Sequence, residues 1–198
     1  MRKALALAMV PSLAVLAAGC SPAIGYKEAA EAAMSPLSAP AQVRDQVLKM
    51  DLRRVLLETE GIDGVSLTPA VFMECGFVVG FTDGVEQADQ IKLAAEQVTD
   101  LRYLNTYLPG RPAESTTESD LETKAAVKGE IALDPELVST RYTVEVLNGE
   151  VVLLGVTMDE AESKRAARAA QGAGGVKRVT NWLMPVEEGY ESIRPHLR

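Results

Sequence analysis

The sequence contains one histidine, two cysteines and one tryptophan, and only 5% of its 198 residues are aromatic. A site built from several histidines is therefore excluded, and we expect no metal ion and no cofactor. Basic residues are also in the minority, because 20 Lys and Arg stand against 28 Asp and Glu, for a formal net charge of -8. Nucleic-acid-binding proteins need a dense basic surface, so nucleic acid is not an expected partner.

Motifs that carry catalysis are absent as well. The sequence has no phosphate-binding loop, no zinc-ligand spacing and no nucleophile elbow. The single histidine, His196, lies in a polar tail, where a solvated position explains it better than a role as general base. The carboxylate pair Asp159-Glu160 suits the start of a helix, whose dipole favours negative charge. We therefore predict no enzymatic activity and assign no catalytic residue.

The first twenty residues have the layout of a secretory signal peptide. Arg2 and Lys3 precede an apolar run from Ala4 to Ala18. This run is too short for a membrane-spanning helix, which needs about 20 apolar residues. It ends in Leu-Ala-Ala-Gly-Cys at residues 16–20, which resembles the bacterial lipobox.

That resemblance implies cleavage between Gly19 and Cys20, so that residues 1–19 are the signal peptide and Cys20 is acylated. An ordinary secretory signal with a chance cysteine is the alternative. Two or three acyl chains on one residue would hold the protein stably at a membrane, since a single chain binds only marginally. Ser21 stands where enterobacterial lipoproteins retained at the inner membrane carry Asp. We therefore expect an outer-membrane lipoprotein that faces the periplasm.

Two segments, 43–109 and 120–186, match each other without a gap. Each matching residue pairs with the one 75 positions later in the chain, as in 120 − 45 = 75, and this constant offset holds throughout. The matches fall mainly on apolar, glycine and alanine positions. Examples are Asp45 with Asp120, Thr68 with Thr143, Gly80 with Gly155, Ala95 with Ala170, and Tyr107 with Trp182. A constant offset over this length indicates a duplicated small domain.

The expected domain plan has a tether, two domains, a linker and a tail. The Ala-, Ser- and Pro-rich tether spans residues 20–42, with a short helix near residues 26–34, and the tail spans 187–198. The two domains span residues 43–109 and 120–186, and a polar linker spans 110–119.

Each domain is predicted to have the element order α-β-β-α-β. In the second, Asp120 is a candidate N-cap for a helix that ends before Pro135. Alternating residues over 142–146 and an apolar run over 151–156 predict two strands joined at Asn148-Gly149, a strong hairpin signal. A helix over 159–172 and a strand over 176–186 follow.

The fold class is therefore α+β, with two tandem units, each a three-stranded mixed sheet that carries two helices on one face. Units this small are only marginally stable alone, so we expect the two to pack together. Cys75, between apolar neighbours, is predicted to be buried rather than reactive.

The runs Asn-Gly-Glu-Val-Val-Leu-Leu-Gly-Val at 148–156 and Gly-Val-Lys-Arg-Val-Thr-Asn at 175–181 resemble the BON domain. This bacterial family includes osmotically induced periplasmic proteins. Two copies over residues 43–186 behind a lipobox resemble the dual-BON outer-membrane lipoproteins. The first copy is degenerate, because Glu74 replaces Gly149 and Asp100-Leu101 replaces Gly-Val. The resemblance implies no catalysis; it implies phospholipid binding or support of the cell envelope.

The motif residues have physical explanations that do not depend on the family. Gly149 permits the tight turn, Gly155 is expected to let the sheet approach a helix, and Val176 and Val179 are expected in the core. A structural role explains them better than a binding role. The full set of structural motif positions is Gly80, Gly149, Gly155, Gly175, Val176 and Val179.

Basic residues of the second domain form the candidate binding site. Residues 45–109 carry five Lys and Arg against eleven Asp and Glu, whereas residues 120–186 carry eight against ten. The candidates for contact with anionic phospholipid, at about 1 kcal/mol each, are Lys164, Arg165, Arg168, Lys177 and Arg178. A solvated helix face paired with Asp159, Glu160 and Glu162 is the alternative.

We thus predict a lipid-anchored envelope protein whose BON domains bind phospholipid membranes and support envelope integrity. The alternative is a periplasmic protein-interaction or chaperone-like module without lipid recognition, and the acidic first domain suits it.

Overall fold

The computed structural model of the chain describes residues 35–186. The first unit consists of α2 (Ala39–Glu58), β1 (Thr68–Phe72), β2 (Cys75–Val79), α3 (Val85–Ala95) and β3 (Tyr103–Tyr107). The second consists of α4 (Thr117–Leu133), the 3-10 helix η1 (Ser139–Arg141), β4 (Tyr142–Leu147), β5 (Glu150–Thr157), α5 (Glu160–Gly172) and β6 (Arg178–Pro185). The predicted α+β fold class with two tandem units is confirmed.

Both sheets have three strands and the same topology. Their orders are β1-β2-β3 and β4-β5-β6, with the first pair of each antiparallel and the second pair parallel. The registers repeat as well, since Cys75 pairs with Tyr103 in the first unit and the matching residues, Glu150 and Arg178, pair in the second. The duplication is therefore a duplication of structure.

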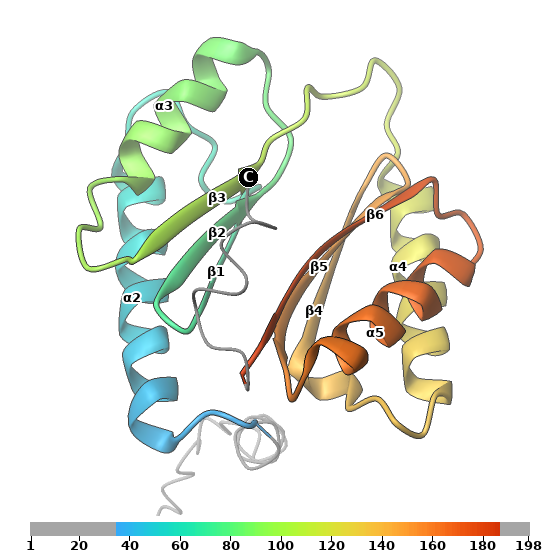
Figure 1. Ribbon diagram of the computed structural model, residues 1–198. Helices are drawn as coiled ribbons and strands as arrows, with labels where there is room; N and C mark the ends of the chain where they lie inside the picture. The colour runs from blue at the N-terminus through green and yellow to red at the C-terminus, as the bar shows by residue number, and fades with distance from the viewer. Residues whose placement is uncertain (1–34, 187–198) are drawn as a thin grey trace, which may run out of the picture.

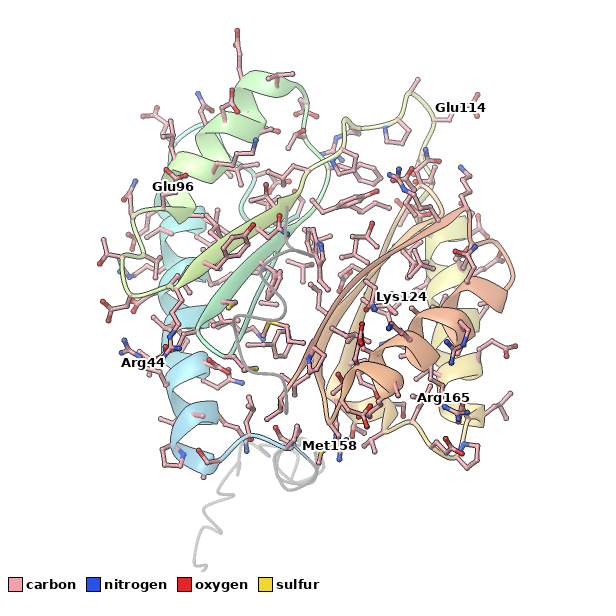
Figure 2. All side chains as sticks on the ribbon, in the orientation of Figure 1. Arg44, Glu96, Glu114, Lys124, Met158 and Arg165 are labelled. Atoms are coloured by element: carbon pink, nitrogen blue, oxygen red, sulfur yellow. The ribbon has the colours of Figure 1, made fainter. Side chains whose placement is uncertain are left out.

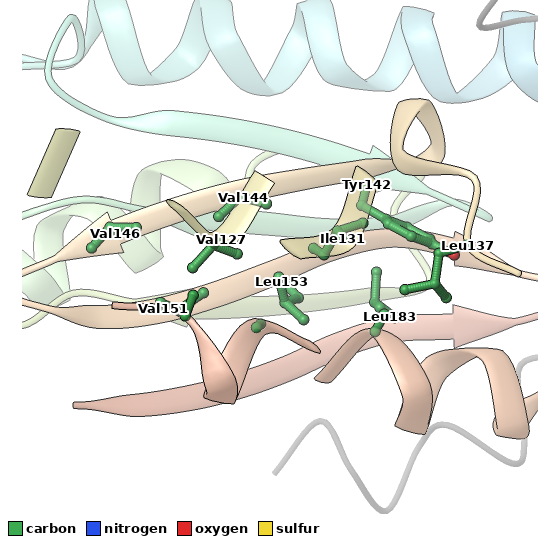
Figure 3. Close-up of a cluster of buried hydrophobic side chains, with 12 residues drawn as sticks. Val127, Ile131, Leu137, Tyr142, Val144, Val146, Val151, Leu153 and Leu183 are labelled. Carbon is green, nitrogen blue, oxygen red and sulfur yellow. The ribbon is translucent and has the colours of Figure 1, made fainter. Parts of the chain in front are cut away.

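The molecule has four layers, with the helices outside and the two sheets facing each other (Figure 1). Val151 and Leu153 of β5 point into the core under α4 and α5, which Figure 3 shows in close-up. Val152 and Leu154, which alternate with them, point to the other face of the sheet, toward the first unit. Because β5 is buried on both faces, its sequence is almost continuously apolar.

A core between the two sheets joins the units, as expected from their small size. Phe77 of β2 lies 5.6 Å from Trp182 of β6 between ring centroids, and Tyr107 of β3 meets the same indole edge-on at 6.2 Å. Side chains fill the space between the sheets (Figure 2). Trp182 therefore belongs to the core between the two sheets, and not to the core beneath α4 and α5.

Two helices begin earlier than the domain plan assumed. Helix α2 begins at Ala39, inside the predicted tether, with Pro40 in its first turn, where a missing N–H costs nothing. Helix α4 begins at Thr117, inside the predicted linker. The rest of the linker packs on the first unit, where Gly110 bridges to Thr82 and Arg111 Nε lies 3.0 Å from an oxygen of Asp83.

Several predictions lie outside the described residues. These are the signal peptide over 1–19, the acylated Cys20, the helix near 26–34 and the tail 187–198. Within residues 35–186, no helix combines the length and apolarity needed to cross a membrane.

Candidate functional site

A buried carboxylate holds the hairpin of the second unit. Asp120, 7% exposed, accepts the backbone N–H of Asn148 at 2.8 Å and that of Gly149 at 2.7 Å. The Thr116 hydroxyl donates to the same carboxylate at 2.7 Å. Asp120 is therefore not the N-cap that the sequence suggested. It lies in the first turn of a helix that starts at Thr117, and its carboxylate points to the turn between β4 and β5.

The turn has the conformation that Asn-Gly favours. Asn148 has φ +54° and Gly149 has φ +73°, so both are left-handed, as a type I′ turn requires. The backbone N–H of Lys177 donates to the Gly149 carbonyl at 2.8 Å, and its Nζ donates to the Asn148 side chain at 2.9 Å. Next to this turn, a Cβ on Gly175 would come within 2.2 Å of the Thr123 hydroxyl. The glycine motif thus joins α4, the hairpin and the start of β6.

The first unit repeats this arrangement without the glycine. Asp45 accepts the N–H of Met73 at 2.9 Å and of Glu74 at 2.8 Å, and the N–H of Arg102 donates to the Glu74 carbonyl at 2.9 Å. These four residues match Asp120, Asn148, Gly149 and Lys177 of the second unit, each 75 positions later. Met73 and Glu74 are left-handed, with φ +53° and +62°, at a cost of roughly 1–2 kcal/mol each. Burial raises the pKa of Asp45 above its ordinary value, against the effect of the two N–H donors.

Gly155 lies against a helix, as predicted, and that helix is the short 3-10 helix η1. A Cβ on Gly155 would lie 2.2 Å from the carbonyl oxygen of Arg141, the last residue of η1. Gly80 faces the equivalent segment of the first unit, since a Cβ there would lie 3.2 Å from the Ser66 carbonyl oxygen. Val176 and Val179 are partly buried and pack against the core beneath α4 and α5.

The five predicted lipid-contacting residues do not form one group of free cations. Lys164 pairs with Glu160 on α5 at 2.7 Å, with both side chains largely exposed. Arg165 pairs with Asp134 at 3.4 Å and also with Glu136. Arg168 and Lys177 are exposed, and neither forms an ion pair with another residue of the range 35–186.

Arg178 has a structural role at the junction of the two units. Its Nη2 lies 2.6 Å from Glu150 and 3.1 Å from the hydroxyl of Tyr107, which also donates to Glu150. Tyr107 ends β3 of the first unit, whereas Glu150 begins β5 of the second. Sequence reasoning missed this link, because Arg178 and Glu150 lie 71 and 43 residues from Tyr107 along the chain.

The described residues contain no cluster of His, Cys, Asp and Glu that could hold a metal ion. Cys75 is buried, its Sγ lies 3.6 Å from the Met73 carbonyl, and burial raises the pKa of its thiol to about 12. As predicted, it is a buried apolar residue and not a reactive thiol.

Comparison with known proteins gives a family match for the second unit. Residues 119–183 match the family model of the BON domain. The match confirms the BON resemblance of the second unit and covers both glycine runs, from the turn at Gly149 to the start of β6. In the BON-matching unit, Asp120, Gly149 and Gly175 together build one end of the fold.

A curated relative extends the similarity beyond that unit. Osmotically-inducible protein Y of Escherichia coli (strain K12) is 24% identical over 143 residues, which cover 70% of this chain and 71% of that protein. Since neither unit alone accounts for 70% of the chain, the alignment includes parts of both.

Solved structures give weaker matches. CdsD, a structural protein of the type III secretion system of Chlamydia trachomatis, is 16% identical, with 76% of this chain and 68% of that chain covered and a TM-score of 0.29. Its C-terminal domain gives 13% identity and a TM-score of 0.28, with 72% and 67% covered. Similarity at this level supports no argument about function.

Proposed function

We propose that the protein is a lipid-anchored envelope protein whose second, BON-matching unit binds anionic phospholipid headgroups and thereby supports the envelope. The BON match, the osmotically inducible relative and the lipobox-like end of the signal peptide support the envelope setting. In this proposal Cys20 is acylated and the folded units lie on the periplasmic side of the outer membrane.

The observation that carries the lipid part is the set of accessible cations around α5. Lys164 and Arg168 are one helical turn apart and exposed, and Lys177 follows the loop that ends α5. The pair between Lys164 and Glu160 is solvent-exposed, and such pairs are worth only about 0–1 kcal/mol, so a phosphate can compete for the ammonium. Arg165 and Arg178 also form ion pairs, with Asp134 and Glu136 and with Glu150, and remain candidates because their side chains are 40% and 63% exposed.

The binding test is flotation of the unlipidated chain from Ser21 onward with vesicles of anionic or zwitterionic phospholipid. We expect it to float only with anionic vesicles, and we expect Lys164→Glu with Arg168→Glu to abolish flotation. Lys92→Glu on α3 is the matched control, since it reverses an exposed lysine of the other unit. Flotation that the double substitution leaves unchanged would refute the site.

The anchor requires a separate measurement. Mass spectrometry of the exported chain should find an N-terminal Cys20 that carries acyl groups. An unmodified chain cleaved elsewhere would remove the lipoprotein assignment but leave the headgroup test intact.

A second function, a protein-interaction module, is favoured by exposed apolar residues on α2. Val43, Val47, Met50 and Leu57 all lie on the solvent side of this helix. Surface apolar residues grouped on one face commonly mark a site of association.

A further inference from the structure

Helix α2 has two apolar faces. Leu48, Leu52 and Leu56 are buried against the sheet of the first unit. The opposite face carries Val43, Val47, Met50, Arg54 and Leu57. The intervals of four and three residues are those of a helix–helix seam. Met50 is 70% exposed and Val43 is 63% exposed, so this second face lies in solvent.

A groove runs beside this face, along the edge strand β1. It consists of two adjoining hollows of about 710 and 950 Å³, which share Gln46, Lys49 and Met50 in their linings. The smaller hollow is lined by the cations Lys49, Arg53 and Arg54. Arg54 pairs with Asp51 at 3.2 Å and with Glu58 at 3.3 Å along α2, so Lys49 and Arg53 carry the excess positive charge. The first unit is otherwise acidic, so this flank of α2 is suited to an acidic partner.

A helix fits this groove better than an added strand. Pro69 lies in β1 and has no N–H to donate, which hinders pairing with a further strand at this edge. The seam-like spacing on α2 matches the mode in which an amphipathic helix lies against a groove.

The duplicated unit shows a complementary face. The counterparts of the exposed α2 residues lie 75 positions later, on α4. They are all exposed and are either acidic or small: Glu118, Glu122, Ala125, Gly129 and Ala132. Gly129 lies inside α4, where glycine costs about 1 kcal/mol relative to alanine. A Cβ there would meet open space, so no contact within the described molecule requires a glycine.

We propose that the outer face of α2 in one copy of the protein docks on the outer face of α4 in a second copy. The two helices lie antiparallel, with Met50 opposite Ala125. Arg53 and Arg54 then lie near Glu122, while Val47 and Val43 lie over Gly129 and Ala132. Small residues on one helix let the larger side chains of the other approach closely.

The contact cannot form within one molecule, because α2 and α4 lie on opposite outer layers (Figure 1). Each copy therefore offers one face of each kind, and the contact is heterologous. Such contacts join copies head to tail, into open chains unless the rotation between neighbours closes a ring. This inference rests on the second proposed function, because it names the occupant of the apolar face of α2, and it does not depend on lipid binding.

The test is cysteine crosslinking of the full chain in cells. Cys75 is buried, and in the proposed lipoprotein the sulfur of Cys20 carries an acyl group, so Met50→Cys and Ala125→Cys supply the accessible thiols. The chain without either substitution measures any crosslinking through Cys20. Chains that carry both substitutions should form a ladder of dimers, trimers and larger species. Two singly substituted chains made together should form dimers only, and either one alone should stay monomeric.

Other results would overturn the proposal. Dimers of Met50→Cys alone would indicate a symmetric α2–α2 contact, and crosslinks only to other proteins would indicate a different partner. Absence of any crosslink from the doubly substituted chain would contradict self-association.

A charge exchange provides an independent check. Arg54→Glu and Glu122→Lys should each lower the crosslinked fraction of the doubly substituted chain at least about threefold, because each places like charges at the contact. The two substitutions combined should restore it. Lys92→Glu serves as a control with no expected effect, and unchanged far-UV circular dichroism would show that every variant is folded. Failure of the combination to restore crosslinking would refute the proposed register.

Discussion

Removal of the Asp120 carboxylate should destabilise the second unit through the hairpin rather than through the helix in which it lies. In Asp120→Ala, the N–H groups of Asn148 and Gly149 lose their acceptor. Gly149 is buried, whereas Asn148 is exposed, so the loss is expected mainly at the Gly149 N–H. An unsatisfied buried donor costs about 1–3 kcal/mol, and hydrogen bonds to a charged acceptor are at the upper end. We expect a loss of about 1–3 kcal/mol in the free energy of unfolding.

The assay is guanidinium unfolding of the purified chain, followed by the fluorescence of Trp182, the single tryptophan. Glu118→Ala is the matched control, because Glu118 is an exposed carboxylate in the same first turn of α4. It should change the free energy by less than about 0.5 kcal/mol, as surface substitutions usually do. Asp120→Asn should fall between the two, since the amide keeps only one of the two oxygens that accept these N–H groups.

The reasoning fails if Asp120→Ala costs no more than Glu118→Ala, because the carboxylate would then act only on the helix dipole. It also fails if Asp45→Ala, at the equivalent position, leaves the first unit unaffected. The two units have the same donor geometry, with distances of 2.7–2.9 Å.

Three further predictions concern the turns and Cys75. Burial raises the pKa of Asp45, so the folded chain binds more protons than the unfolded chain in the window above about pH 4. The free energy of unfolding should therefore fall with rising pH in that window, relative to Asp45→Asn, and denaturant titrations that show no such trend would contradict this. Gly149→Ala should cost about 1–2 kcal/mol, because φ is +73° and the new Cβ would lie 3.0 Å from the Gly175 carbonyl oxygen. Gly174→Ala, which meets open space, should cost almost nothing in the same denaturant titrations. The Cys75 thiol, with its pKa raised to about 12, should react with a thiol reagent at pH 8 only after denaturation, and rapid labelling of the native chain would show that it is accessible.

The architecture is accessible from the sequence because its signals are local or repeated. The Asn148-Gly149 turn predicts a hairpin, and the constant offset between matching positions predicts two copies. The unbroken apolar run of β5 also carries a signal for the packing of the sheets, since a strand that covers one core only should alternate.

The role of Asp120 was missed because a carboxylate ahead of an apolar helix has the pattern of an N-cap. A signal for its true role was present, since Asp45 and Asp120 are among the few polar pairs kept at the constant offset. The early start of α2 was missed for a similar reason: Pro40 suggests a tether, although proline is equally suited to the first turn of a helix.

The composition of the basic site could not be predicted. Whether an arginine is free depends on carboxylates brought near it by the fold, such as Asp134 for Arg165 and Glu150 for Arg178. These partners lie 31 and 28 residues away along the chain. The spacing of Lys and Arg along the sequence carries no information about them.

The core between the sheets determines how the protein can be dissected. Expression of either half by itself would leave Phe77 or Trp182, together with a whole face of aliphatic side chains, in water. A half-molecule prepared to assign activity to one copy would therefore tend to aggregate or to bind apolar surfaces indiscriminately, and its apparent affinity for vesicles would be an artefact of the cut. Point substitutions in the intact chain are the appropriate way to separate the contributions of the two copies.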